Sequence, residues 1–93
     1  IRMNTTTSLT SPATVHIKRV PVCVAAALMG KTDQYIRIRM QRGLISIGSA
    51  VKISPSRYDY YISPKLFMEY TGATEEAIVR EMVAQGKERY LYE

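Results

Sequence analysis

The sequence predicts a small α+β fold that is mainly helical, and three observations lead to this class. The chain has 93 residues, which suits one domain around one core. Hydrophobic residues make up 46% of it, enough to build that core. Between Val20 and Gly72, short helical segments punctuated by glycines surround a stretch that is rich in β-forming residues.

The chain divides into three parts by composition. Residues 1–14 are rich in Thr, Ser and Asn, so we expect a flexible leader. Residues 15–86 carry the regular hydrophobic patterns and are expected to form the domain, with a short lead-in strand within 15–20. Residues 87–93 follow a glycine and are expected to be a loose tail.

The first helix is predicted over residues 22–29, which are mostly Ala, Val and Leu. Pro21 fits its first turn, where a missing backbone N–H is not needed. Gly30 is expected to end it, because glycine readily adopts the left-handed conformation. Cys23 lies in this apolar run and is expected to be a buried core residue.

The second helix is predicted from Asp33 to Arg42. Thr32 is a suitable N-cap, and Gly43 is expected to stop the helix. An apolar stripe at four-residue spacing is expected to face the first helix: Ile36, Met40 and Leu44. Polar or basic residues and one isoleucine fall on the opposite side: Gln34, Arg37, Ile38 and Gln41. Arg39 and Arg42 flank this outer face.

A β-hairpin is predicted next, with strands over residues 50–53 and 58–62. The run Ser54-Pro55-Ser56-Arg57 has the composition of a turn. Gly48 and Ser49 are expected to form a bend that interrupts the extended chain before the hairpin.

Two further helices are predicted after the hairpin. Ser63 and Pro64 are a strong helix start, and Leu66, Phe67 and Tyr70 are expected to close the core. The last helix begins near Thr74 and ends near Gly86. Its apolar stripe contains Ile78 and Met82, and two roles stay open for it: packing on the domain or contact with a second copy of the chain. This order of helix, glycine turn, basic helix, hairpin and closing helix is typical of a winged helix-turn-helix with a C-terminal helix.

Positive charge gathers on the first part of the chain. From His16 to Arg57 the sequence has eight Lys or Arg against one Asp, a balance of +7, and from Tyr58 to Glu93 it has four against seven, a balance of −3. This asymmetry favours a polyanionic partner for the helix pair and hairpin, and the second helix predicts that the polyanion is double-stranded DNA.

The residue types assign roles in DNA contact. Residues that can read base edges in the major groove are Gln34, Arg37, Ile38 and Gln41. Residues suited to phosphates are Lys31, Tyr35, Arg39, Arg42, Lys52 and Arg57. Core packing is the alternative for Tyr35, and a solvated surface charge is the alternative for each arginine. Tyr58 and Tyr60 share one face of their strand and Tyr61 lies on the other, so core packing is favoured over a base-stacking platform.

The segment from Val20 to Gly72, about half the chain, resembles the excisionase and MerR-like family of winged helix-turn-helix proteins. The resemblance is carried by Ala25-Ala26, Met29-Gly30-Lys31, Arg42-Gly43-Leu44-Ile45 and Tyr58-Asp59-Tyr60-Tyr61-Ile62 before Ser63-Pro64. The run from Tyr61 to Phe67 looks especially like proteins of prophages and conjugative elements in Gram-positive bacteria. No long dimerising helix or cysteine-rich effector site follows, so metal or drug sensing is not expected.

This resemblance implies a role in DNA recombination or transcription regulation. The expected function is an excisionase-like recombination directionality factor or a small transcriptional regulator of a mobile element, in the bacterial cytoplasm. The expected partners are double-stranded DNA and, on it, an integrase or further copies of the chain. The alternative from another class is a protein-interaction adaptor with the same fold.

The sequence offers no basis for an enzyme, a metal site or a cofactor. His16 is the one histidine, Cys23 is the one cysteine, and no glycine-rich phosphate loop is present. The lone cysteine also excludes an intramolecular disulfide and agrees with a reducing compartment. The apolar run after Val20 is shorter than the roughly 20 residues that span a bilayer, so no membrane association is expected.

Overall fold

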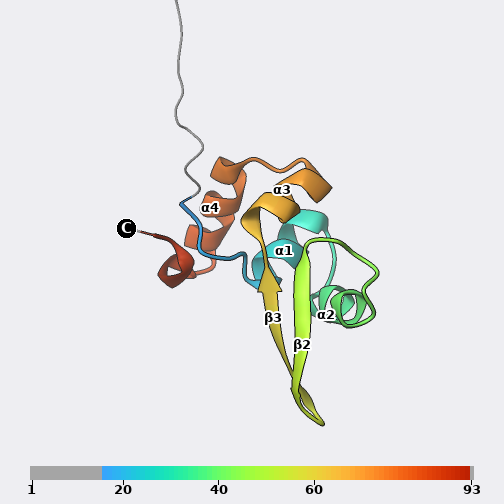
Figure 1. Ribbon diagram of the computed structural model, residues 1–93. Coiled ribbons are helices and arrows are strands. Elements are labelled where there is room, and N and C mark those ends of the chain that lie inside the picture. The colour runs from blue at the N-terminus through green and yellow to red at the C-terminus, as the bar shows by residue number, and fades with distance from the viewer. Residues whose placement is uncertain (1–15, 93) are drawn as a thin grey trace, which may run out of the picture.

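The computed structural model describes residues 16–92, which form an α+β arrangement of helices and one antiparallel hairpin (Figure 1). The elements in chain order are α1 (Val22–Met29), α2 (Asp33–Gln41), β2 (Gly48–Ser54), β3 (Arg57–Ile62), α3 (Pro64–Thr71), α4 (Glu75–Ala84) and the 3-10 helix η1 (Glu88–Tyr90). The arrangement is compatible with a winged helix. The expected flexible leader, residues 1–14, lies outside the described residues.

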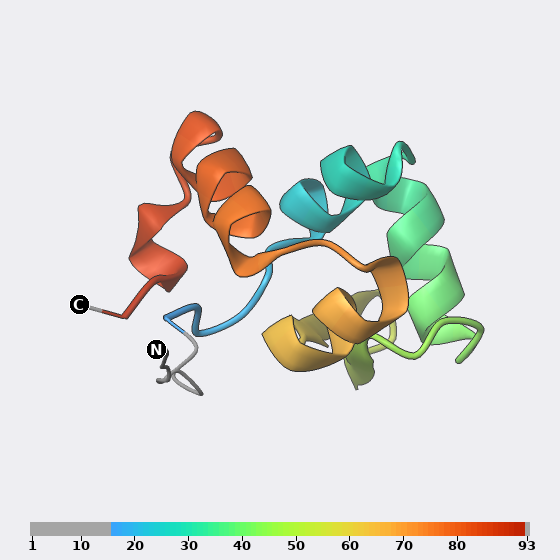
Figure 2. The same ribbon diagram turned by 90° about the horizontal axis from the view of Figure 1, so that it is seen from above.

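Helices α1 and α2 begin and end where their capping residues predict. Gly30 ends α1 with a φ of 69°, and the Thr32 hydroxyl caps α2 by accepting a hydrogen bond from the Tyr35 N–H at 3.1 Å. Ile36 and Met40 are buried, and α2 packs against α1. Helix α1 lies between α2 on one side and α4 on the other (Figure 2).

The prediction for Leu44 is wrong, because α2 ends before reaching it. The helix stops at Gln41, and Gly43 turns the chain with a φ of 66°. Leu44 is therefore outside the helix, and its side chain is 56% exposed. The apolar stripe of α2 consists of two residues, and Ile45 and Ile47 in the following loop complete the burial there.

The hairpin is longer than predicted and extends away from the helices (Figure 1). Strand β2 pairs with β3 from Gly48 opposite Ile62 to Ser54 opposite Arg57, with an irregularity between Lys52 and Ser54. The expected bend at Gly48 and Ser49 is wrong, since both residues belong to β2. The backbones of β2 and β3 approach closely at Gly48, where a Cβ would clash with the Tyr61 carbonyl oxygen.

The remaining helices close the core. Ser63 caps α3 and Thr74 caps α4, each through its side-chain oxygen. Phe67 of α3 is fully buried, as predicted. Ile78 and Met82 of α4 are also fully buried, so of the two roles left open for them the structure shows packing on the domain. Leu66 and Tyr70 are not buried: they are 41% and 51% exposed, because α3 presents only its Phe67 face to the interior.

Two positions near the core differ from prediction. Cys23 is half-buried rather than fully buried, and its carbonyl accepts a hydrogen bond from the Gln85 side chain at 3.4 Å. Instead of a strand before α1, Ile17 forms an isolated antiparallel bridge to Leu91. Within residues 16–92, no helix combines the length and apolar character needed to cross a bilayer.

The C-terminal segment is docked, so the expectation of a loose tail is wrong for residues 87–92. The Tyr90 carbonyl accepts a hydrogen bond from the Lys18 N–H at 2.7 Å. The Tyr92 N–H donates to the His16 carbonyl at 2.8 Å. These two hydrogen bonds flank the bridge between Ile17 and Leu91, and the Ile17 side chain is buried. The three contacts connect the two ends of the described chain.

Candidate nucleic-acid interface

The outer face of α2 is open to solvent, as the sequence predicted. Gln34, Arg37 and Gln41 are exposed, and Ile38 is half-buried between them. This face is opposite to Ile36 and Met40, which bind α2 to the core. All four candidate base-reading residues therefore lie on one rigid helix, outside the packed interface.

Arg37 has only a weak intramolecular partner. Its guanidinium lies 3.7 Å from the Asp33 carboxylate, one helical turn earlier, and both side chains are 45% exposed. Exposed pairs at this spacing contribute about 0.3–0.5 kcal/mol. Breaking the ion pair with Asp33 therefore costs little free energy, and the guanidinium can bind a stronger anionic or hydrogen-bonding partner instead.

Gln41 connects α2 to the hairpin. Its side-chain amide donates a hydrogen bond to the hydroxyl of Tyr60 in β3. Tyr60 is half-buried against the core and stacks on Tyr58, with ring centroids 6.1 Å apart and planes inclined by 29°. The hairpin is therefore braced against the outer face of α2, while Tyr61, on the other face of the hairpin, is 42% exposed.

The other flank of α2 carries an aromatic ring between two cations. The Tyr35 ring centroid lies 4.9 Å from the Lys31 Nζ atom and 4.4 Å from the Arg39 guanidinium carbon. Tyr35 is half-buried and packs against the core, which supports the packing alternative for its ring. Each cation–π contact of this kind contributes about 0.5–1 kcal/mol and holds the cation in place.

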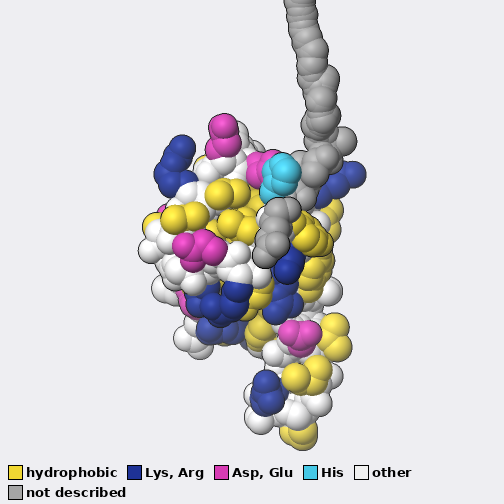
Figure 3. All heavy atoms as spheres, turned by 90° about the vertical axis from the view of Figure 1, so that its left-hand side faces the viewer, with side chains coloured by type: hydrophobic (Ala, Val, Ile, Leu, Met, Phe, Trp, Pro, Cys, Tyr) yellow, Lys and Arg dark blue, Asp and Glu magenta, His cyan; other side chains and the backbone are white. Residues whose placement is uncertain are grey.

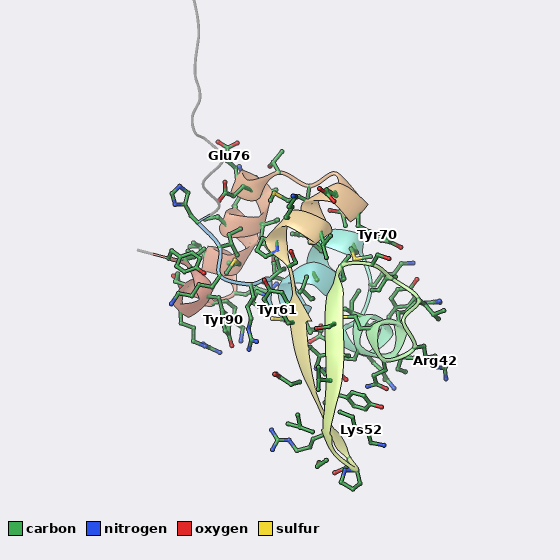
Figure 4. All side chains as sticks on the ribbon, viewed as in Figure 1. Arg42, Lys52, Tyr61, Tyr70, Glu76 and Tyr90 are labelled. Carbon is green, nitrogen blue, oxygen red and sulfur yellow. The ribbon has the colours of Figure 1, made fainter. Side chains whose placement is uncertain are left out.

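The remaining candidate phosphate-binding residues lie at the ends of the elements. Arg42 follows the last turn of α2 and points away from the body of the molecule (Figure 4). Lys52 on β2 and Arg57 at the start of β3 are exposed near the hairpin tip, far from the helices. The structure thus places basic side chains on the flank of α2, at its end and along the hairpin.

A groove with a volume of about 410 Å³ lies beside α2 and includes a further group of basic residues. Asp33 and Arg37 line it from α2, and Tyr58, Asp59 and Tyr60 line it from β3. The groove is also lined by three residues for which the sequence predicts no role: Arg19, Lys87 and Tyr90. Basic residues next to an aromatic one were visible in the sequence, but no local pattern shows that residues 19 and 87–90 meet.

Comparisons with family models, with curated proteins and with solved structures return no match to this chain.

Proposed function

We propose that this chain is a sequence-specific, double-stranded DNA-binding protein of the winged helix-turn-helix type. In this proposal α1 and α2 are the helix-turn-helix pair, and the β2–β3 hairpin is the wing. The observation that carries the proposal is the outer face of α2, where Gln34, Arg37 and Gln41 are exposed beside a braced basic hairpin. A helix with this exposed face fits the major groove, which is about 12 Å wide.

The proposed mechanism separates base reading from positioning. Arg37 can donate two hydrogen bonds to guanine, and Gln34 and Gln41 can each pair with an adenine edge. Ile38 can contact a thymine methyl group. Phosphate contacts fix the register without reading sequence, and they fall to six residues: Lys31, Tyr35, Arg39, Arg42, Lys52 and Arg57.

The biological role proposed for this activity is architectural. The chain acts as an excisionase-like recombination directionality factor or as a small transcriptional regulator of a bacterial mobile element. Several copies side by side can bend DNA for an integrase, because bending lets more contacts form. The proposal includes no cofactor and no chemical step, and it places the protein in the bacterial cytoplasm.

The test is a gel-shift titration with a duplex selected from a random library by the wild-type protein. Arg37→Ala should weaken binding to this duplex by about 1–3 kcal/mol, because one bidentate base contact is lost. Arg80→Ala is the matched control, since Arg80 is exposed on α4 and does not line the groove beside α2. Equal affinities of the Arg37 variant and the control variant would contradict the proposed reading helix.

One observation favours a second candidate, a protein-interaction adaptor. On the face of the hairpin turned away from Tyr60, Val51 is 56% exposed near the exposed Tyr61, and Ile53, at the irregularity near the hairpin tip, is 55% exposed. Apolar side chains grouped in this way can form a protein contact. The adaptor is supported if the wild-type chain selects no duplex from the library and binds random duplex DNA without the steep salt dependence of phosphate contacts.

A further inference from the structure

Two arginines that are far apart in the sequence share one tyrosine ring. The Arg19 guanidinium carbon lies 5.3 Å from the Tyr90 ring centroid, and that of Arg89 lies 4.8 Å from it. Lys87 and Arg19 line the same groove wall as Tyr90. We call Arg19, Lys87, Arg89 and Tyr90 the Tyr90 cluster.

The fold holds this cluster together through the backbone. The Lys18 N–H donates to the Tyr90 carbonyl, and the bridge of Ile17 to Leu91 fixes the next residue on each side. Lys87 is also anchored, because its N–H donates to the Met82 carbonyl at the end of α4 at 2.8 Å. The positions of the three cations therefore depend on the folded core and not on a free chain end.

Within the part of the chain that the structure describes, the cations of the cluster have no carboxylate partner. The one ion pair among residues 16–92 joins Arg37 to Asp33. Two guanidinium groups around one ring repel each other, and an anion placed beside them would offset this repulsion. The pKa of Tyr90 is lowered, mainly by hydrogen bonding from Arg89 to its hydroxyl; burial opposes this shift, and hydrogen bonding from Arg19 and the charges of both arginines lower the pKa further.

Three members of the cluster, Arg19, Lys87 and Tyr90, line the same groove that Arg37 lines from α2. Tyr90 is on the side of the molecule that faces left in Figure 4, beyond the base of the hairpin. Seen from that side, a group of Lys and Arg side chains lies just above the hairpin (Figure 3). Along the groove a polyanion would meet Arg37 next to the carboxylates of Asp33 and Asp59, and it would meet Arg19 and Lys87 of the cluster.

We propose that the Tyr90 cluster is a second backbone-binding site for duplex DNA, in which Arg19, Lys87 and Arg89 contact phosphates beyond the segment that α2 reads. The inference rests on the proposed function and extends its footprint to the N- and C-terminal segments. Arginine suits this role because its planar guanidinium can bind phosphate oxygens through two N–H groups. The cluster adds affinity for any sequence and carries no base preference.

The experiment measures the salt dependence of binding to a random-sequence 30-base-pair duplex between 50 and 200 mM KCl. Each lost phosphate contact reduces the slope of log affinity against log salt by about 0.9. For the double variant Arg19→Gln/Arg89→Gln, the affinity change over this salt range should therefore be about 12-fold smaller than for wild type. The charge-matched control is Lys65→Gln/Arg80→Gln, on the exposed surfaces of α3 and α4, and it should keep the wild-type slope.

Lys87→Gln supplies an independent test that leaves the Tyr90 ring and both arginines on it unchanged. Its affinity change over the same salt range should be about 3.5-fold smaller than for wild type. Circular dichroism of every variant checks that the fold is retained, and the lysine variant replaces the double variant if the latter fails to fold. Wild-type slopes in both the Lys87 variant and a folded double variant would overturn the inference.

The outcome is separable from that of the proposed function. If wild-type protein binds the selected duplex and Arg37→Ala weakens it, while the cluster variants keep the wild-type slope, only the second site is wrong. If wild-type protein binds no duplex DNA with a salt-dependent affinity, both proposals fall together. Ethylation of single phosphates shows where on the duplex the contacts lie, because ethylation of a contacted phosphate weakens binding. For the double variant, ethylation of one group of phosphates outside the α2 site should no longer weaken binding.

Discussion

At the scale of single residues, Gly48 determines how closely strands β2 and β3 approach each other at the base of the hairpin. Its Cα faces the Tyr61 carbonyl, and the neighbouring Ser63 N–H donates to the Ile47 carbonyl at 2.9 Å. Any side chain at this position must push one strand away from the other. The strain would reach Ile47 and Ile62, which are both fully buried.

Gly48→Ala should therefore lower the free energy of unfolding by at least roughly 2 kcal/mol, since even one methyl group cannot fit without backbone movement. Urea denaturation followed by circular dichroism measures this change. Ser49→Ala is the control, because Ser49 is exposed in the same strand and its substitution should alter stability by less than about 0.5 kcal/mol. A Gly48→Ala variant as stable as the Ser49→Ala variant would contradict the close approach.

Residue chemistry explains which positions were predictable. Thr32, Ser63 and Gly30 act through local rules of helix capping, and each appears where the sequence indicated. Leu44 and Gly48 were assigned wrongly because their environments depend on chain direction after a turn and on the approach of a partner strand. Neither property is contained in a window of neighbouring residues.

At the scale of elements, α2 owes its fixed beginning to one side chain. The Thr32 hydroxyl satisfies the Tyr35 N–H, which would otherwise lack a partner in the first turn. Tyr35 and Arg37 belong to this turn and the next one, so the cap also determines how firmly the start of the outer face is held. The helix has nine residues, too few for intrinsic helical stability to hold it alone.

Thr32→Ala should lower the free energy of unfolding by about 0.5–2 kcal/mol, because the first turn of α2 loses its capping acceptor. Thermal or urea denaturation gives the measurement, and Thr32→Ser is the matched control because serine retains the capping oxygen. Stability losses of equal size in the two variants would show that the Thr32 methyl group, and not the cap, is responsible.

The elements themselves were largely predictable, because each carries its own pattern. The α1 helix was predicted with its observed bounds, and α2 was predicted one residue too long. The hairpin was predicted in place, but β2 begins two residues earlier than expected because Gly48 and Ser49 pair with β3. The exposed face of α2 followed from its periodicity, whereas the hydrogen bond from Gln41 to Tyr60 did not, since it joins two elements.

At the scale of the whole molecule, the described ends of the chain stabilise each other. The Leu91 side chain packs partly buried against the core, and backbone hydrogen bonds on either side of it join residues 16–18 to residues 90–92. Pairing between residues that are so far apart in the chain produces no pattern in the sequence around either of them. This is why residues 87–92 were assigned to a loose tail and why the Tyr90 cluster was missed.

Deletion of residues 88–93 should lower the free energy of unfolding by about 2–4 kcal/mol, the combined effect of losing partial leucine burial and two backbone hydrogen bonds. The deletion keeps Lys87, whose N–H caps α4. Denaturant titration of this variant, compared with one that lacks only residue 93, provides the measurement. Equal stability of the two would mean that the segment does not contribute to the folded state.

The contact between His16 and Tyr92 also gives the folded unit the topology of a nearly closed ring. A short glycine-rich linker is enough to span backbone atoms that are already 2.8 Å apart. Covalent closure at that point, with new ends opened at the exposed hairpin tip, would reorder the sequence without rearranging the core. Because residues 16 and 92 are adjacent, a second unit fused to the C-terminal side would begin next to the N-terminal side of the first unit.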